Sequence, residues 1–208
     1  ALALGMQRMA KRKALVRKMV AIETLGAVSV ILTDKTGTLT ENDMRVKKIW
    51  HEGSEQSLEL LLRGCVLGNT ASLVNGKEVV GDKTDGSLLL FAKEQKVDLT
   101  TFMSEGEVID EYVFDPTTKT VTIIWKKDQK ELVLVRGAPE RILESSTSAF
   151  LNGKKVSLTD KNTRIVQDAF TSFAKEGLRV IGFGYREIID GKKFEREELE
   201  KNLIFLGF

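Results

Sequence analysis

The sequence predicts an α/β fold in which helices flank a sheet, and three patterns lead to this prediction. Residues 82–97 carry apolar side chains on one side of an expected helix. Segments 120–126 and 130–136 have strand-like composition and are joined by a short charged turn, which is typical of an antiparallel hairpin. Residues 27–32 form a nearly continuous apolar run, which is typical of a buried parallel strand.

The N-terminal part is expected to contain one helix and one strand. Over residues 2–20, apolar side chains fall near one helical face. The apolar run at 27–32 ends in the polar loop 33–40, and open α/β sheets bind ligands at the carboxyl ends of their strands. Residues 44–50 are interpreted as a strand that leads away from this loop.

Capping and stop signals mark the remaining helices. Asp82 or Thr84 is expected to cap the helix over 82–97, because either side chain can accept a hydrogen bond from the first turn. The helix over 159–176 begins at a Thr/Asp cap and ends at Gly177. The other expected elements are a helix over 57–67, a hairpin turn at Asn152-Gly153, and strands over 108–114, 120–126, 130–136, 179–185 and 203–208.

Composition limits the class of function. The 208 residues include 32 Lys and Arg against 30 Asp and Glu, a formal net charge of +2. Six of the basic residues lie within residues 6–20, where no acidic residue occurs, so the remaining chain holds 26 basic and 30 acidic residues. The basic character belongs to one segment, and nucleic-acid binding is not expected. The single Cys65 and single His51 exclude zinc sites built from several Cys and His side chains.

The segment with the strongest chemical signal is Asp34-Lys35-Thr36-Gly37-Thr38-Leu39-Thr40. The carboxylate of Asp34 can act as a nucleophile toward phosphorus. Lys35, Thr36 and Thr38 supply a cation and hydroxyl groups for the oxygens of a phosphoryl group. These residue types at the end of an apolar run predict phosphoryl transfer, whereas a polar loop without catalysis would not need so many of them together.

This segment resembles the phosphorylation motif of P-type ATPases, the ion pumps that form an aspartyl-phosphate. The resemblance implies that Asp34 is the phosphorylated residue and that Lys35 and Thr36 contact the γ-phosphate of ATP. It also implies that Asp34 and the Thr36 carbonyl group ligate Mg²⁺. Related phosphatases of the haloacid-dehalogenase class carry a second Asp where this chain has Thr36. A persistent acyl phosphate is therefore expected, which favours a pump over a soluble phosphatase.

Two further segments resemble parts of the nucleotide-binding domain of the same family. Residues 114–119 lie where the family places an aromatic side chain that stacks on adenine, and Phe114 can fill this role. Lys119, in the same segment, is implied as a further nucleotide-binding residue. An ordinary core position is the alternative for Phe114. Residues 136–140 resemble the Lys-Gly-Ala-Pro-Glu motif at the base of the nucleotide pocket, where Gly137 lets the backbone approach a ligand. Arg136 replaces the usual Lys, so a planar guanidinium group with several N–H donors replaces the compact charge of an ammonium group.

Two weaker segments complete the implied pocket. Residues 81–85 stand where the family commonly has Gly-Asp-Pro-Thr-Glu; Thr84 is retained, and Asp85 replaces a Glu that approaches the adenine amino group. Residues 177–180 match a segment whose Arg contacts the nucleotide phosphates, here Arg179. The nucleotide-binding residues implied by the resemblance are therefore Thr84, Asp85, Phe114, Lys119, Arg136, Gly137 and Arg179.

The resemblance covers essentially the whole chain and implies its domain organisation. Residues 1–26 are expected to be a stalk helix and linker from a membrane helix, and residues 27–45 the N-terminal part of the phosphorylation domain. Residues 46–203 are expected to form the nucleotide-binding domain, and residues 204–208 to start a return strand. The implied fold is α/β, with a twisted antiparallel sheet flanked by helices, attached to an incomplete haloacid-dehalogenase-like phosphorylation domain.

The implied function is ATP binding and aspartyl-phosphate formation that drives cation transport across a membrane. The stalk and Glu140 favour the calcium-pump-like branch; a proton pump is the alternative suggested by the Phe-Asp-Pro segment, and a nucleotide-binding module without turnover is another for this chain alone. The implied partners are ATP, Mg²⁺, the transported cation, and the actuator and remaining phosphorylation domain of the same chain.

The basic residues within 6–20 are interpreted as the cytoplasmic end of a membrane helix, where Lys and Arg are common. No apolar run approaches the roughly 20 residues that cross a bilayer. We therefore expect a piece of a longer protein, namely the cytoplasmic headpiece of an integral membrane protein, which is soluble by itself.

Overall fold

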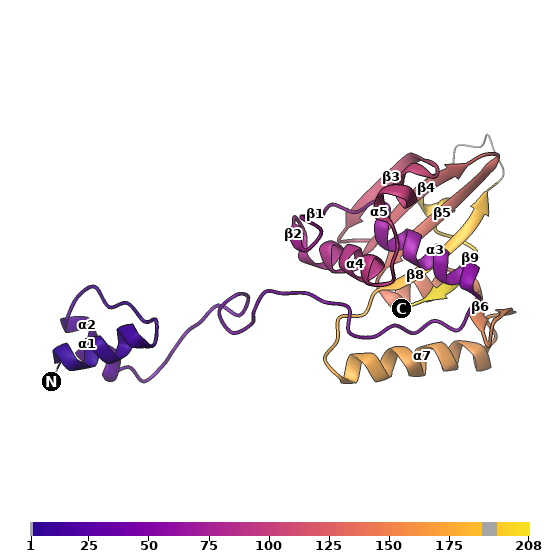
Figure 1. The fold of residues 1–208 in the computed structure, drawn as a ribbon. Helices are drawn as coiled ribbons and strands as arrows, with labels where there is room; N and C mark the ends of the chain where they lie inside the picture. Colours follow the sequence, from indigo (N-terminus) through magenta and orange to yellow (C-terminus); the bar gives the residue numbers. More distant parts are fainter. Residues whose placement is uncertain (1, 189–194) are drawn as a thin grey trace. The chain divides into compact units, whose positions relative to one another are not determined.

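The computed structural model describes residues 2–188 and 195–208, and the chain divides into two units, Ala1–Asp43 and Met44–Phe208. Each unit is described by itself (Figure 1). No helix within the described ranges is both long and apolar enough to pass through a membrane.

The first unit contains two short helices in place of the single helix expected over residues 2–20. These are α1 (Leu2–Lys11) and α2 (Val20–Gly26). The backbone of Lys13 has a φ of 63°, in the left-handed region, and a residue in this conformation ends an α-helix. The expected helix is therefore interrupted within its cluster of basic residues.

The strand expected over residues 27–32 is absent from the first unit as described. The segment is irregular, and the Ile31 and Leu32 side chains are 80% and 94% exposed. A parallel strand needs neighbouring strands at its edges and covered faces, and the described part of this unit contains no strand that could supply them. The prediction of a parallel strand that carries Asp34 is therefore wrong for this structure, and an attached haloacid-dehalogenase-like sheet is not seen.

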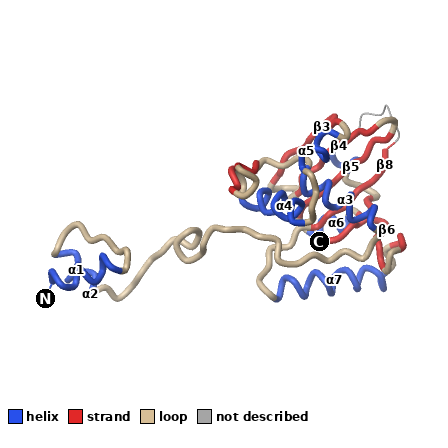
Figure 2. Tube along the Cα trace, in the orientation of Figure 1, coloured by secondary structure: helices blue, strands red, loops and turns tan. Residues whose placement is uncertain are grey.

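The second unit is built on a seven-stranded sheet, drawn in red in Figure 2. Its strand order is β3-β4-β5-β8-β9-β6-β7, and every neighbouring pair is antiparallel except β6 and β9. The strands are β3 (Glu107–Asp115), β4 (Thr120–Lys127), β5 (Lys130–Gly137), β6 (Ser146–Leu151), β7 (Lys154–Ser157), β8 (Gly182–Ile188) and β9 (Leu203–Gly207). A two-stranded ribbon, β1 (Ser72–Val74) with β2 (Glu78–Val80), lies outside this sheet. The expected antiparallel sheet is thus confirmed, with one parallel pair added.

Local signals predicted two hairpins of the sheet. Strands β4 and β5 pair in register from Thr120 opposite Gly137 to Lys127 opposite Lys130, as the charged turn indicates. Asn152 and Gly153 join β6 to β7 with positive φ values of 50° and 75°, the backbone conformation that a tight two-residue hairpin turn requires.

Strand β9 lies inside the sheet. It pairs with β8 on one side and with β6 on the other, and the Leu203 and Phe205 side chains are fully buried. Residues 204–207 therefore belong to this sheet, and their expected role as the start of a return strand toward the phosphorylation domain stays a prediction. The expected strand over 44–50 is irregular, but Trp50 and Phe208 exchange two backbone hydrogen bonds of 3.0 and 2.9 Å.

Helices cover both faces of the sheet. Val133 and Val135 of β5 pack in a core with Ile142 and Val166, whereas their neighbour Leu134 packs in another core with Leu67. This alternation is the two-residue period of a strand that is buried on both faces. The helices are α3 (Glu55–Val66), α4 (Lys83–Glu94), α5 (Leu99–Ser104), α6 (Pro139–Glu144), α7 (Asp160–Lys175) and α8 (Arg196–Leu199).

The helices expected from capping signals are confirmed. The Asp82 side chain accepts a hydrogen bond of 2.9 Å from the backbone N–H of Asp85, so Asp82 rather than Thr84 caps α4. Thr159 caps α7, and Ser54 caps α3. The Asp82 cap fixes the first turn of α4, which borders the cavity described next.

Candidate functional site

A cavity of about 660 Å³ opens in the second unit. Its wall combines the loop after α3, the first turn of α4, the ends of β3 and β5, the turn before β4 and the segment before β8. Sites for small molecules commonly have volumes of roughly 300–1,000 Å³. All seven residues that the resemblance implies for nucleotide binding line this one cavity: Thr84, Asp85, Phe114, Lys119, Arg136, Gly137 and Arg179.

Phe114 lies at a β-bulge on the cavity wall. Tyr112 pairs with Thr122 and Asp115 with Thr120, so two residues of β3, Val113 and Phe114, stand opposite one residue of β4. A bulge changes the direction in which a side chain points. The Phe114 side chain is 59% exposed, which excludes the alternative of an ordinary core position and leaves its ring available for stacking.

A tight turn carries Lys119 from β3 to β4. The backbone N–H of Lys119 donates to the Asp115 carbonyl at 2.6 Å, and the N–H of Thr117 donates to the Asp115 carboxylate at 2.7 Å. The hydrogen bond from the Thr117 N–H to this carboxylate is the largest cause of the lowered pKa of Asp115. A Cβ atom on Gly137 would lie 2.2 Å from the Lys119 carbonyl oxygen. Only glycine therefore allows the end of β5 to pack this closely against the turn.

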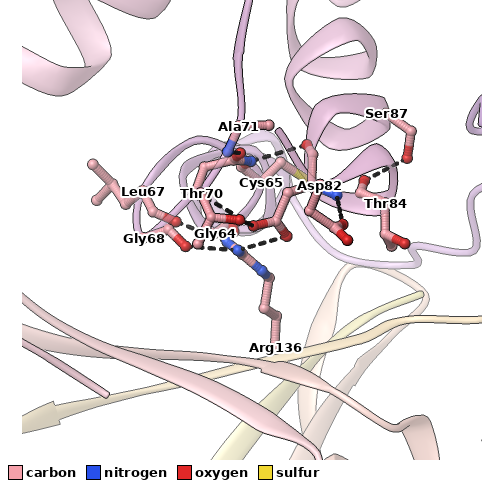
Figure 3. Close-up of polar contacts among 12 residues, drawn as sticks. Gly64, Cys65, Leu67, Gly68, Thr70, Ala71, Asp82, Thr84, Ser87 and Arg136 are labelled. Carbon is pink, nitrogen blue, oxygen red and sulfur yellow. Dashed lines mark hydrogen bonds and ion pairs between the residues drawn. The ribbon is translucent and has the colours of Figure 1, made fainter. Parts of the chain in front are cut away.

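Arg136 forms the base of the cavity through contacts with protein groups (Figure 3). Its side chain is 4% exposed. Nη1 donates to the carbonyl oxygens of Gly64 at 3.0 Å and Leu67 at 2.8 Å, and Nη2 donates to that of Gly68 at 2.7 Å. Carbonyl groups at the end of a helix lack partners within the helix, and a cation is favourable there. Arg136 thus stabilises the C-terminus of α3 and the loop that follows it.

Asp85 completes this arrangement. Its Oδ1 accepts from Nη2 of Arg136 at 3.0 Å, and its Oδ2 accepts from the N–H and hydroxyl groups of Thr70 at 2.9 and 2.8 Å. The resemblance implies that Asp85 approaches an adenine amino group, but here its carboxylate joins α4 to the loop after α3. The short Asp85 side chain therefore contacts the Arg136 guanidinium group at the base of the cavity.

The two departures from the family motifs therefore contact each other. Where the family has Lys and Glu, this chain has the longer Arg136 and the shorter Asp85, and they form an ion pair. Nothing local in the sequence links the two replacements, because 51 positions separate the two residues. That both replacements occur in one pocket was the only signal of their pairing.

Arg179 and Lys119 are the exposed cations of the cavity. Nη1 of Arg179 donates to the Thr84 hydroxyl group at 3.0 Å, which joins the segment before β8 to the first turn of α4. Across residues 2–188 and 195–208, no carboxylate forms an ion pair with either cation. Their charge is available to an anionic ligand.

Cys65 belongs to α3 and is fully buried. Burial raises the pKa of its thiol to about 12, and the charge of Arg136 offsets only part of this rise. At pH 8, roughly one native molecule in ten thousand would hold a thiolate. We expect the native chain to react with an aromatic disulfide reagent only as fast as it opens, and the chain in denaturant to react at once. Equal rates in the two states would contradict this burial.

The segment that resembles a phosphorylation motif, residues 34–40, forms a turn in the first unit. The Asp34 carboxylate accepts a hydrogen bond of 2.7 Å from the backbone N–H of Lys35, and the Lys35 carbonyl accepts from Leu39 and Thr40 at 2.9 and 3.2 Å. Gly37 has a φ of 77°, which is why a glycine suits this position. Asp34, Lys35 and Thr36 are exposed, and they do not belong to the cavity of the second unit.

A metal ion at this turn would depend on few protein ligands. No group of three or more His, Cys, Asp or Glu side chains suited to a metal ion occurs in the described part of the chain. Asp34 offers one carboxylate and Thr36 a backbone carbonyl group, both of them hard oxygen donors. Mg²⁺ is commonly held by one or two carboxylates together with phosphate and water oxygens, so these donors fit Mg²⁺ bound with a phosphorylated ligand.

Comparison with known proteins identifies the family. Residues 57–208 match the family model described as P-type ATPase, cytoplasmic domain N. The chain is 31% identical to a calcium-transporting ATPase of Bacillus subtilis, with 100% of the chain and 27% of that protein covered. It is 34% identical to calcium-transporting ATPase 1 of Saccharomyces cerevisiae, with 99% and 25% covered. It is 29% identical to the sodium/potassium-transporting ATPase subunit alpha-4 of Homo sapiens, with 99% and 24% covered.

The chain thus spans about a quarter of the length of these relatives. The family model covers more than half of the chain, including every residue of the cavity, and the relatives match the chain from end to end. This chain therefore belongs to the P-type ATPase family, in its calcium-pump-like part, and contains the family's cytoplasmic domain N.

Proposed function

We propose that the chain binds ATP in the cavity of the second unit and that, in a complete pump, Asp34 receives the γ-phosphoryl group to drive cation transport. The observation that carries this proposal is the convergence of seven residues from separate segments on one cavity of about 660 Å³. A cavity of this size accommodates a nucleotide.

Each wall of the cavity suits a different part of ATP. The exposed ring of Phe114 offers a face on which adenine stacks, an interaction open to any base. Lys119 and Arg179 attract the triphosphate, because neither is neutralised by a carboxylate within the described residues. Arg136 and Asp85 fix the base of the cavity through the α3 and α4 contacts and take no direct part in binding phosphate.

The chemical step uses Asp34. A carboxylate oxygen of Asp34 attacks the γ-phosphorus, the bond to the β-phosphate oxygen breaks, ADP leaves, and an acyl phosphate remains on Asp34. Lys35 stabilises the negative charge of the transferred group. Mg²⁺, held by Asp34 and the Thr36 carbonyl, would neutralise phosphate charge when bound. Thr36 provides no second carboxylate, so the acyl phosphate lasts long enough for a conformational change.

The cation and the cellular setting belong to the same proposal. The relatives are named as calcium-transporting ATPases in Bacillus subtilis and Saccharomyces cerevisiae and as a sodium/potassium-transporting ATPase subunit in Homo sapiens. We place this chain in a cation pump of the calcium-transporting kind, as a cytoplasmic headpiece that works with an actuator domain and the rest of the phosphorylation domain.

A nucleotide titration of the 208-residue chain, followed by amide NMR, tests the cavity. ATP is expected to shift the signals of Phe114, Lys119 and Arg179 and to leave those of α7 in place. Phe114→Ala is expected to raise the Kd for ATP by about tenfold, because stacking of a base on an aromatic ring contributes roughly 1–3 kcal/mol. Met103→Ala, which also truncates an exposed apolar side chain, is the matched control. Unshifted cavity signals at millimolar ATP would overturn the assignment.

A further inference from the structure

A buried polar cluster lies on the face of the sheet opposite the cavity. Its members are Thr120 and Thr122 on β4, and Arg196 and Glu200 at the two ends of α8. The two threonines alternate with Val121, which lines the cavity, so their hydroxyl groups point to the other face. The carboxylate of Glu200 accepts from Thr120 at 2.9 Å, from Thr122 at 2.6 Å and from Nε of Arg196 at 2.8 Å. A charge this deeply buried is stable only with such partners.

Arg196 extends this cluster to the bulge that carries Phe114. Its Nη2 donates to the carbonyl oxygen of Thr120 at 2.8 Å. Its Nη1 lies 3.5 Å from the carbonyl oxygen of Val113 and 3.9 Å from the carboxylate of Asp115. Val113 and Asp115 are the two neighbours of Phe114, so one guanidinium group contacts the chain on both sides of the aromatic residue.

The bulge needs support of this kind. Where two residues of one strand face a single residue of the next, the extra residue remains unpaired and the ladder of backbone hydrogen bonds is disrupted. Within residues 2–188 and 195–208, strand β3 is also the edge strand of the sheet and pairs with β4 alone. The contacts from Arg196 therefore replace restraints that the sheet does not supply at Val113 and Phe114.

We propose that Arg196 and Glu200 are positioning residues for the nucleotide. Glu200 orients the guanidinium group, Arg196 holds the bulge, and the bulge sets the direction of the Phe114 ring in the cavity. Helix α8 thereby determines nucleotide affinity from the far face of the sheet, without touching the ligand. This inference rests on the proposed ATP site.

A double-mutant cycle on the 208-residue chain tests the inference. Arg196→Met is expected to raise the Kd for ATP by about fivefold, measured at a temperature at which the variant is fully folded. In the Phe114→Ala background the same substitution is expected to change the Kd by less than about twofold, because the ring through which Arg196 acts is already absent. The Phe114 ring signals of the ligand-free protein are expected to shift in Arg196→Met.

Arg63→Met is the matched control. Arg63 is an arginine buried more deeply than Arg196, with ion pairs to Glu59 and Glu105, but it contacts no residue of the bulge. This variant is expected to lose stability and to keep both the Kd and the Phe114 signals. If Arg196→Met does not fold, Thr122→Val, which removes one donor to Glu200, takes its place in the cycle.

The outcomes separate the two proposals. Failure of the unsubstituted chain to bind ATP would overturn the proposed function. Normal binding by the parent chain, weakened by Phe114→Ala but unchanged by Arg196→Met, would overturn the positioning role alone. An equal loss of affinity with and without the Phe114 ring would also overturn it, because Arg196 would then act by another route.

Discussion

Replacing Arg136 by methionine is expected to lower the free energy of unfolding of the second unit by about 3–5 kcal/mol. The substitution leaves the carbonyl groups of Gly64, Leu67 and Gly68 without their donor and leaves Asp85 as a partly buried carboxylate with one partner fewer. Buried groups without partners account for most of such a loss. Urea denaturation followed by tryptophan fluorescence measures it, since both tryptophans, Trp50 and Trp125, lie in this unit.

The family's own residues supply the control. Arg136→Lys alone is expected to lose part of the stability, because a lysine cannot reach four acceptors with one ammonium group. In the double variant Arg136→Lys with Asp85→Glu, a shorter cation faces a longer carboxylate. We expect its loss in free energy of unfolding to be about 1 kcal/mol smaller than the sum of the two single losses. Strict additivity of the two substitutions would show that the residues do not act as a pair.

In a full-length pump that carries these residues, Asp34→Asn is expected to abolish labelling by the γ-phosphate of ATP. A neutral amide is a poor nucleophile and cannot form an acyl phosphate. The readout is acid-stable incorporation of labelled phosphate, with loss of the label in hydroxylamine as the mark of an acyl phosphate. ATP binding in the cavity is expected to persist, because Asp34 does not line it.

Glu41→Gln provides the comparison for this experiment. Glu41 is another exposed carboxylate close to the motif, and its replacement removes the same charge. We expect normal labelling of this variant. A labelled Asp34→Asn protein would refute the role of Asp34 as phosphoryl acceptor.

Much of the fold could be predicted because its signals are local. Asp82 caps α4, Thr159 caps α7, and Asn152-Gly153 form the turn between β6 and β7. In each case a few adjacent residues determine the local structure. The apolar run at 27–32 misled the prediction, because an apolar sequence forms a buried strand only where partner strands exist. The place of β9 in the sheet was likewise missed, since its partners β6 and β8 lie far away in the sequence.

The cavity was predicted from the resemblance, and the contacts within it were not. The order and spacing of the motifs were sufficient to predict that Phe114 and Arg179 line one cavity. The pairing of Arg136 with Asp85, and the support of the bulge by Arg196, depend on side chains that meet only in three dimensions. No periodicity or motif marks such contacts in a single sequence.

The hydrogen bonds between Trp50 and Phe208 have a mechanical consequence. They hold Trp50, close to the start of the second unit at Met44, one strand spacing from Phe208. Two segments held side by side in this way can both connect to a surface turn of another domain without stretching that turn, as tolerated domain insertions show. A force that pulls these two segments apart would load the two hydrogen bonds first, so these bonds are expected to break before the sheet unfolds.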